Sequence, residues 1–238
     1  MKAKFKYIVV ISFVLIMVAL SIELPSGIFA IQDKNIIGKI NLEQQNMQSD
    51  SHQQSLSIMD KLKFLGGPGL SSLALDQGKY FNKKTILSAA LNEIKALKKS
   101  GIFPQIDDDI NFEDGTAKLY ISKDQPSKSL ILWNITFYNK NATGTLSLDD
   151  ETGKILMFVI TKLNGVPQYE LSKSTAETWG AYLGFNVKES YIKPAKDKLY
   201  YEGTYLMTTY SQGSNTIMYD IIKYNNGYSF GSWPEKNY

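Results

Sequence analysis

The chain has an apolar run over residues 7–22, which contains only Ser12 and Ser21 as small polar residues, directly after Lys2, Lys4 and Lys6. Such a basic flank stays in the cytoplasm while the apolar run enters the membrane or the export channel. The run exceeds an ordinary signal-peptide core and falls slightly short of the ~20 residues that span a bilayer upright. Residues 1–30 are therefore either an uncleaved signal-anchor or a cleaved signal peptide. Both alternatives place the rest of the chain outside the cytoplasm.

The next segment, residues 31–57, is polar and rich in Gln, Asn and Ser. It has no apolar period that a core would bury, so it predicts a flexible tether. The only histidine, His52, lies in this tether. A short helical or irregular piece is expected from Ile58, interrupted by the glycines and proline of residues 66–69.

A helix is predicted after Thr85, a candidate N-cap, because apolar residues then recur at helical spacing until Gly101 ends the pattern. The period then changes to that of strands, and the expected strands are residues 117–122, 130–139, 144–148 and 154–163. The turn 149–153, Asp-Asp-Glu-Thr-Gly, joins the last two strands as a hairpin.

A second helix followed by strands is predicted in the C-terminal part. Ser174 and Glu177 have capping-box spacing, and the helix is expected to end at Gly184. Block 131–139 aligns with block 217–225, with identical residues at four positions. This similarity favours an internal duplication over a chance match between residue types that are common in strands. The predicted fold class is α+β, with two helix-plus-antiparallel-sheet repeats, 58–168 and 169–238, after the N-terminal membrane or signal helix and the polar linker.

One motif resembles a known family. Residues 146–155, Leu-Ser-Leu-Asp-Asp-Glu-Thr-Gly-Lys-Ile, are similar to the hairpin of the PepSY domain, in which a strand ends in Asp, two residues precede Thr-Gly, and an aliphatic residue follows. The resemblance covers residues 85–163, and 170–233 more weakly. It implies an extracytoplasmic, non-catalytic module of the kind associated with restraining or stabilising secreted peptidases and cell-wall hydrolases. It also implies that the sheets, not the hairpin tip, contact such a partner.

Composition excludes several chemistries. The chain has no cysteine, which rules out disulfides, cysteine nucleophiles and lipoprotein processing, and a single histidine in a tether suits neither a zinc site nor a catalytic triad. Beyond residues 1–30, which hold three lysines and Glu23, 23 lysines face 22 acidic residues, a net charge of +1. That balance gives no argument for nucleic acid. The lack of arginine and the abundance of Asn, Ile, Lys and Tyr are typical of an AT-rich, Gram-positive-type bacterium.

The acidic segment after residue 106 can be compared with a calcium-binding loop. Asp107, Asp109, Asn111 and Glu113 occupy positions 1, 3, 5 and 7 of an EF-hand-like loop, but the turn glycine and the bidentate glutamate at position 12 are missing. A looser calcium site on these four residues is a candidate, and a solvated acidic loop is the favoured interpretation.

Aromatic residues suggest where a partner binds. Eleven of the fifteen tyrosines lie from Tyr169 onward, and successive residues of a strand point to opposite faces. One tyrosine-bearing face is therefore available to a partner, although tyrosine also simply favours strands. The candidate anchors are Trp133, Tyr200, Tyr205 and Tyr219.

The hairpin tip is expected to be exposed. Replacing Asp150 or Glu151 should then change the free energy of unfolding by no more than about 0.5 kcal/mol. Replacing Gly153 by a β-branched residue should cost ~1 kcal/mol or more if its φ is positive.

These observations predict a non-catalytic extracytoplasmic binding or regulatory module that is membrane-anchored or secreted. Its expected partner is a secreted peptidase, a wall hydrolase or another cell-wall component, and no cofactor is expected. The alternative from another class is a cell-envelope hydrolase that uses an unrecognised pair of carboxylates.

Overall fold

The computed structural model describes residues 55–113, 115–124, 127–197, 201–225 and 227–231. The predicted signal segment and residues 31–54 of the tether lie outside these residues. Within the described part, no helix is long and apolar enough to cross a membrane.

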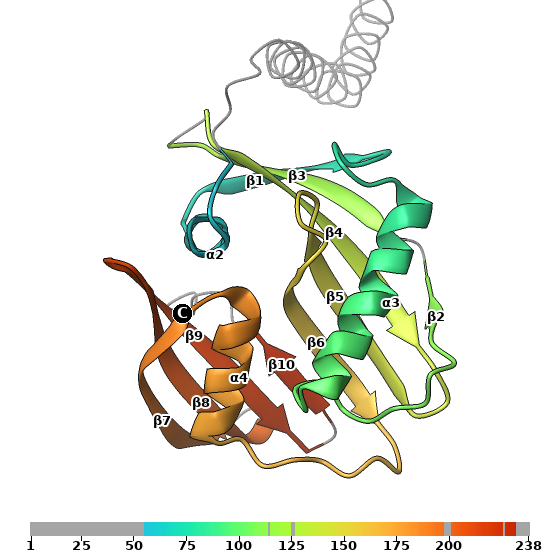
Figure 1. Ribbon diagram of the computed structural model, residues 1–238, viewed down its shortest axis with the longest axis vertical. Coiled ribbons are helices and arrows are strands. Elements are labelled where there is room, and N and C mark those ends of the chain that lie inside the picture. Colours follow the sequence, from blue (N-terminus) through green and yellow to red (C-terminus); the bar gives the residue numbers. More distant parts are fainter. Residues whose placement is uncertain (1–54, 114, 125–126, 198–200, 226, 232–238) are drawn as a thin grey trace, which may run out of the picture. The chain divides into compact units, whose positions relative to one another are not determined.

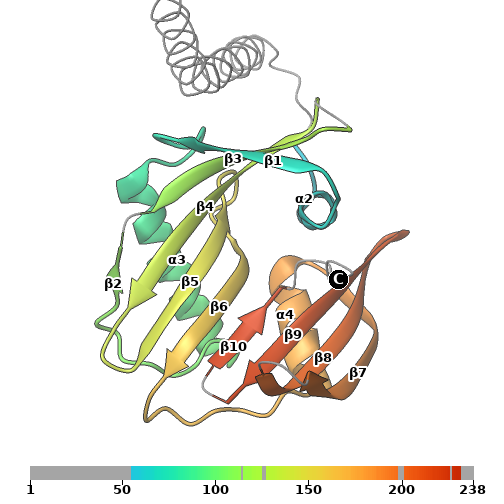
Figure 2. The same ribbon diagram turned by 180° about the vertical axis from the view of Figure 1, so that it is seen from behind.

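The described chain forms three helices and one antiparallel sheet of ten strands. The helices are α2 (Ile58–Leu65), α3 (Lys83–Lys99) and α4 (Lys173–Leu183). The strands are β1 (Leu70–Leu75), β2 (Asn111–Phe112), β3 (Thr116–Ser122), β4 (Ser129–Tyr138), β5 (Ala142–Asp149), β6 (Ile155–Leu163), β7 (Asn186–Asp197), β8 (Tyr201–Gln212), β9 (Asn215–Tyr224) and β10 (Gly227–Phe230). Their order across the sheet is β1-β3-β4-β5-β6-β10-β9-β8-β7, and β2 pairs with β4 (Figures 1 and 2).

The predicted fold of two helix-plus-sheet repeats is wrong. Strand β10 pairs with β9 on one side and with β6 on the other, so all strands belong to a single sheet. The aligned blocks 131–139 and 217–225 fall mainly in β4 and β9. After α3, β4 is the second strand of the run β3-β4-β5-β6, whereas β9 is the third of the run that follows α4. The two blocks are similar because both contain residue types that favour strands, and they do not occupy equivalent positions in the fold.

Ser57 is the N-cap of helix α2, and its side chain accepts a hydrogen bond from the backbone N–H of Asp60. Its residues Met59, Leu62 and Leu65 are buried because they recur at helical spacing on one face. Strand β1, for which the sequence analysis made no prediction, begins after Gly69, whose φ is 72°. Its six residues, Leu-Ser-Ser-Leu-Ala-Leu, do not alternate strictly between apolar and polar side chains.

The N-cap of helix α3 lies three residues before the predicted cap, Thr85. Asn82 is the N-cap and accepts hydrogen bonds from the N–H groups of Lys84 and Thr85, while the hydroxyl of Thr85 accepts from the N–H of Asn82. Thr85 is therefore the third residue of a capping box rather than the cap itself. Helix α4 has the same arrangement with Ser172 as N-cap and Thr175 as third residue, so the capping box predicted at Ser174 and Glu177 is wrong. Gly184, with a φ of 82°, caps its C-terminus. A left-handed residue after the last turn favours glycine, as the sequence predicted.

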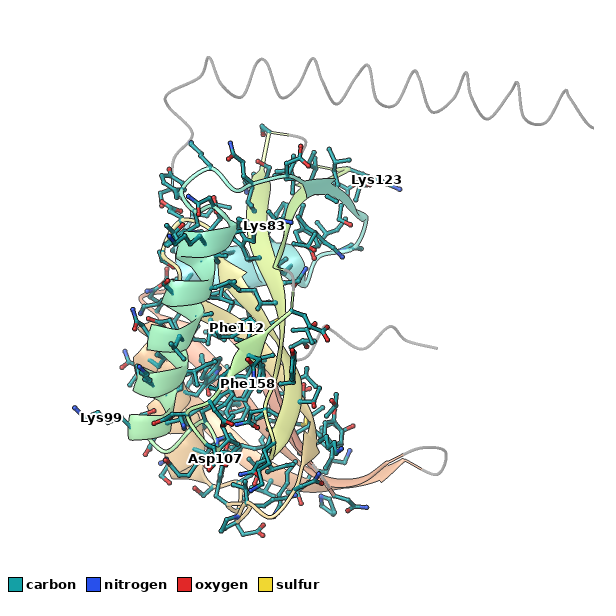
Figure 3. The ribbon with its side chains drawn as sticks, turned by 90° about the vertical axis from the view of Figure 1, so that its right-hand side faces the viewer. Lys83, Lys99, Asp107, Phe112, Lys123 and Phe158 are labelled. Atoms are coloured by element: carbon teal, nitrogen blue, oxygen red, sulfur yellow. The ribbon has the colours of Figure 1, made fainter. Side chains whose placement is uncertain are left out.

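Helices α3 and α4 lie on the same face of the sheet (Figures 1 and 2). In β4, the side chains of Trp133, Ile135 and Phe137 are buried on this face, and Asn134 and Thr136 alternate with them on the other. Figure 3 shows α3 running between Lys83 and Lys99, with Phe158 of β6 between the helix and the sheet. We call the opposite surface, which neither α3 nor α4 covers but on which Lys61 of α2 reaches Asp149, the second face.

Aromatic rings join the two parts of the sheet where β10 meets β6. The rings of Phe158 and Phe230 stack with their centroids 4.4 Å apart, and Trp179 of α4 contacts both rings edge-on, at 5.8 and 5.2 Å. A Cβ at Gly227 would lie 1.8 Å from the carbonyl oxygen of Ile160, so only glycine permits this close approach of β10 to β6.

Candidate functional site

The hairpin between β5 and β6 is fixed by its own motif. One carboxylate oxygen of Asp149 accepts hydrogen bonds from the backbone N–H of Thr152 at 3.1 Å and from its hydroxyl at 2.7 Å. The N–H of Gly153 donates to the carbonyl of Asp149 at 2.8 Å, and Gly153 has a φ of 70°. The Asp-x-x-Thr-Gly pattern therefore has a structural cause, because each of its residues closes the turn.

A buried lysine from α2 reaches the same aspartate. The Lys61 ammonium donates to the two carboxylate oxygens of Asp149 at 3.0 and 2.9 Å, and to Glu151 at 2.6 Å. Lys61 is 3% exposed and Asp149 is fully buried. A buried pair of this kind adds little net stability over apolar residues, but removing one partner leaves an uncompensated charge. The pair thereby fixes where α2 sits against the hairpin.

Asp150 is also buried, so the prediction of an exposed tip is wrong for this residue. Its carboxylate accepts hydrogen bonds from the backbone N–H groups of Lys79, Tyr80 and Phe81, at 2.7, 3.0 and 3.3 Å. The indole N–H of Trp133 donates to it at 2.7 Å. The segment between β1 and α3 wraps over the tip, and this segment comes from a part of the chain some seventy residues earlier.

The two aspartates bear on the hydrolase alternative. A general acid or base must exchange a proton with substrate, and so needs a lone pair that substrate can reach. The oxygens of Asp149 and Asp150 are both buried and already accept several donors each. Their arrangement holds the hairpin, α2 and the segment before α3 together. It does not provide a reactive pair.

The four candidate calcium ligands are exposed: Asp107 and Asp109 lie in the loop before β2, Asn111 is in β2, and Glu113 follows it. The side chain of Asp107 accepts a hydrogen bond from the Asn141 amide at 3.0 Å, and the Asn111 amide contacts the carbonyl of Asp109 at 3.4 Å. Among the residues that the structure describes, no group of three or more acidic or histidine side chains is arranged to hold a metal ion. Figure 3 places Asp107 near the end of α3 marked by Lys99.

The structure separates the four predicted partner anchors. Trp133 and Tyr219 are core residues, with exposed fractions of 0% and 3%, and the Tyr219 hydroxyl donates to the carbonyl of Leu156 at 2.7 Å. Tyr200 lies outside the described residues. Tyr205 alone is partly accessible, half-buried in β8.

The face on which Tyr205 lies follows from its neighbours. Tyr210 of β8 packs against α4, and its hydroxyl donates to the carbonyl of Ala176 at 2.9 Å. Residues an even number of positions away, including Leu206 and Thr208, are buried on that side. Tyr205 and Met207 therefore lie on the second face.

Two strongly exposed side chains lie on the strands next to Tyr205 and Met207. Tyr191 of β7 is 49% exposed and sits directly opposite Met207, while Met218 of β9 is 62% exposed and sits opposite Thr209. We call Tyr191, Tyr205, Met207 and Met218 the tyrosine–methionine patch. Its residues lie on three adjacent strands, so they present a continuous surface.

Sequence reasoning missed two parts of this arrangement. Lys61 falls on the apolar stripe of α2 between Met59 and Leu62, and a charged residue at such a position signals a buried partner. The exposure of Tyr191 and Met218 could not be predicted, because a large apolar side chain in a strand has the same local sequence whether it is exposed or buried.

Comparisons with known proteins assign no family. No protein-family model, curated protein or solved structure matches the chain.

Proposed function

We propose that this chain is a non-catalytic, extracytoplasmic binding module that holds a protein partner on the tyrosine–methionine patch. The observation that carries the proposal is the exposure of Tyr191 and Met218 on a sheet face that neither α3 nor α4 covers. Tyrosine and methionine are enriched where proteins meet. Tyrosine buries a large area with few rotatable bonds, and the flexible, polarizable side chain of methionine adapts to irregular surfaces.

The charges around the patch favour a protein over a polyanion. Glu189 is paired across the sheet with Thr209, and Lys193 with Tyr205, so both signs border the patch on β7. With a net charge near zero beyond the signal segment, this surface offers no extended basic field for nucleic acid or an anionic membrane. A secreted peptidase or wall hydrolase with an apolar contact surface fits these features.

The docking of α2 onto the sheet also suits a regulatory role, because α2 directly follows the tether. The Lys61–Asp149 pair ties α2, the element next to the tether, into the sheet. A partner held on the patch would thus be held near the membrane if the signal segment is retained. The rival proposal, an envelope hydrolase with its own carboxylate pair, gains nothing from Asp149 and Asp150.

The test uses the full-length chain in its native envelope, with a photo-crosslinking residue in place of Met218 and, as control, in place of Tyr80. Tyr80 is 59% exposed but lies in the segment before α3, away from the patch. We expect the Met218 probe to crosslink one peptidase or wall hydrolase that the Tyr80 probe does not reach. The captured enzyme's activity should change when the purified module is added.

Binding energy should concentrate on the patch. Tyr191→Ser and Met218→Ser should each weaken binding of the captured enzyme by about tenfold or more, as is usual for interface anchors. Tyr80→Ser should leave binding unchanged. Equal crosslinking from both probes, or hydrolysis of wall polymer by the purified module alone, would overturn the proposal.

A further inference from the structure

The two ends of the ten-stranded sheet are built differently. Strands β1 and β7 are its terminal strands, and each pairs with one neighbour only among the described strands (Figure 2). Natural edge strands avoid unwanted pairing through charged residues and proline. Strand β7 carries Lys188, Glu189, Lys193, Pro194 and Lys196, whereas β1 reads Leu-Ser-Ser-Leu-Ala-Leu, with no charge and no proline.

The backbone groups that β1 offers can be identified from its pairing. Gly69 is opposite Lys123 in continuation of the β1–β3 register, and the N–H of Lys123 donates to the carbonyl of Gly69 at 3.1 Å. In an antiparallel ladder, residues that bond inward alternate with residues that point outward. Odd-numbered residues of β1 therefore bond to β3, and Leu70, Ser72 and Ala74 direct their N–H and C=O groups away from the sheet.

We infer that the outer edge of β1 pairs antiparallel with β1 of a second copy of this chain. A two-fold axis at Ser72 places Ser72 opposite Ser72, and Leu70 opposite Ala74 in both directions. Each of the three outward-pointing residues then meets an outward-pointing residue, so every outer N–H and C=O of these residues is paired. A shift of the axis to Leu73 leaves Leu70 without an outward-pointing partner.

The side chains are compatible with this register. On one face Ser72 meets its own copy, which allows a hydroxyl–hydroxyl hydrogen bond, and Ser72 is exposed in the single chain. On the other face the half-buried Leu73 lies diagonal to Leu73 of the second copy, within reach of side-chain contact. No charged residue of β1 opposes a like charge. A copy of the same strand is therefore a complementary occupant of this edge.

The contact is short, so the dimer should be weak and concentration-dependent in solution. Confinement of two copies on one membrane would raise their effective concentration. The edge is at the opposite end of the sheet from β7, so this pairing is independent of the tyrosine–methionine patch and of the proposed function.

Sedimentation of the purified full-length chain in detergent over a concentration series tests the pairing. We expect a monomer–dimer equilibrium that Ser72→Pro shifts to monomer, since proline removes an outward N–H without touching the β1–β3 ladder. Ser72→Ala keeps the N–H group and should retain the dimer. A purely monomeric wild type, or a dimer that Ser72→Pro leaves intact, would overturn the inference.

Position-specific crosslinking captures even a weak dimer, because the chain contains no cysteine of its own. With a short bis-thiol reagent, Ser72→Cys should form several-fold more covalent dimer than Lys193→Cys, which is exposed on the opposite edge. Equal yields from the two variants would contradict the pairing, as would capture of a different envelope protein by Ser72→Cys. Tyr191→Ser and Met218→Ser should not change the dimer, which separates this outcome from that of the proposed function.

Discussion

At Asp150, four N–H donors converge on one carboxylate that water scarcely reaches. An amide in its place has only one acceptor oxygen and presents an NH₂ group to donors that need an acceptor. We therefore expect Asp150→Asn to lower the free energy of unfolding by about 2–4 kcal/mol, measured by urea denaturation. This expected loss of stability is larger than the change of about 0.5 kcal/mol predicted for an exposed Asp150.

The matched control for Asp150 is Glu170, whose side chain is 81% exposed and pairs with Lys223 at the surface. Glu170→Gln should change stability by less than about 1 kcal/mol, because exposed ion pairs contribute little. If both variants unfold at the urea concentration of the wild type, the carboxylate of Asp150 does not hold the segment before α3.

At the scale of the element, the docking of α2 depends on a charge that comes from β5. Lys61→Met should cost about 3–5 kcal/mol, because Asp149 would remain buried without its cation. The loss should appear first as faster hydrogen exchange in α2 and β1, since these elements depend on the contact.

A double-mutant cycle distinguishes this cause from simple loss of packing. Lys61→Met combined with Asp149→Asn removes both charges. The double variant should therefore lose less free energy of unfolding than the sum of the losses in the two single variants. Additive costs would show that the two residues do not act on each other. Asp149→Asn alone also weakens the turn, because Thr152 donates twice to the same carboxylate.

At the scale of the whole molecule, the continuity of the sheet depends on the close approach of β10 to β6. Gly227→Ala forces a Cβ against the carbonyl of Ile160, which must move to admit it. We expect this variant to lose about 2 kcal/mol or more and to raise hydrogen exchange in β10, with β3 and β4 less affected. Gly213→Asn, in the hairpin between β8 and β9, is the control, because no atom lies within 4 Å of its Cβ position and Asn tolerates its φ of 61°. Equal stability of the two variants would contradict this account of the sheet.

Buried tyrosines set the response of the fold to alkaline pH. Burial raises the pKa of Tyr169, Tyr182, Tyr210 and Tyr219, and it raises that of Tyr228 to about 12. Unfolded tyrosines ionise near pH 10, so above that pH the unfolded chain has lost protons that the folded chain keeps. Stability is therefore full below pH ~10 and should fall as the pH rises toward 12.

Tyr228→Phe isolates one contribution to this response. Between pH ~10.5 and 11.5 its free energy of unfolding should fall less steeply than that of the wild type, by up to about 1.4 kcal/mol per pH unit. Guanidinium denaturation at several pH values measures both slopes. The same slope in both proteins would mean that the Tyr228 phenol ionises normally in the fold.

Much of the element pattern could be predicted from local sequence. The strands expected at 117–122, 130–139, 144–148 and 154–163 correspond to β3, β4, β5 and β6, and the turn 149–153 joins the last two. Helix α3 followed from apolar spacing, and only its cap was displaced, from Thr85 to Asn82. Trp133 and Tyr219 were misplaced as partner anchors because a strand's sequence does not say which of its faces a helix will cover.

The sequence by itself determined the alternation of helices and strands, the hairpin with its Asp and Gly, and the absence of cysteine chemistry. These depend on residues close together in the chain or on composition alone. Tertiary structure decided that β10 joins β6, that Asp150 is buried by residues 79–81, and that Tyr191 and Met218 remain exposed. Each of these depends on contacts between segments dozens of residues apart, and the free energy of such contacts depends on burial and geometry that no local pattern encodes.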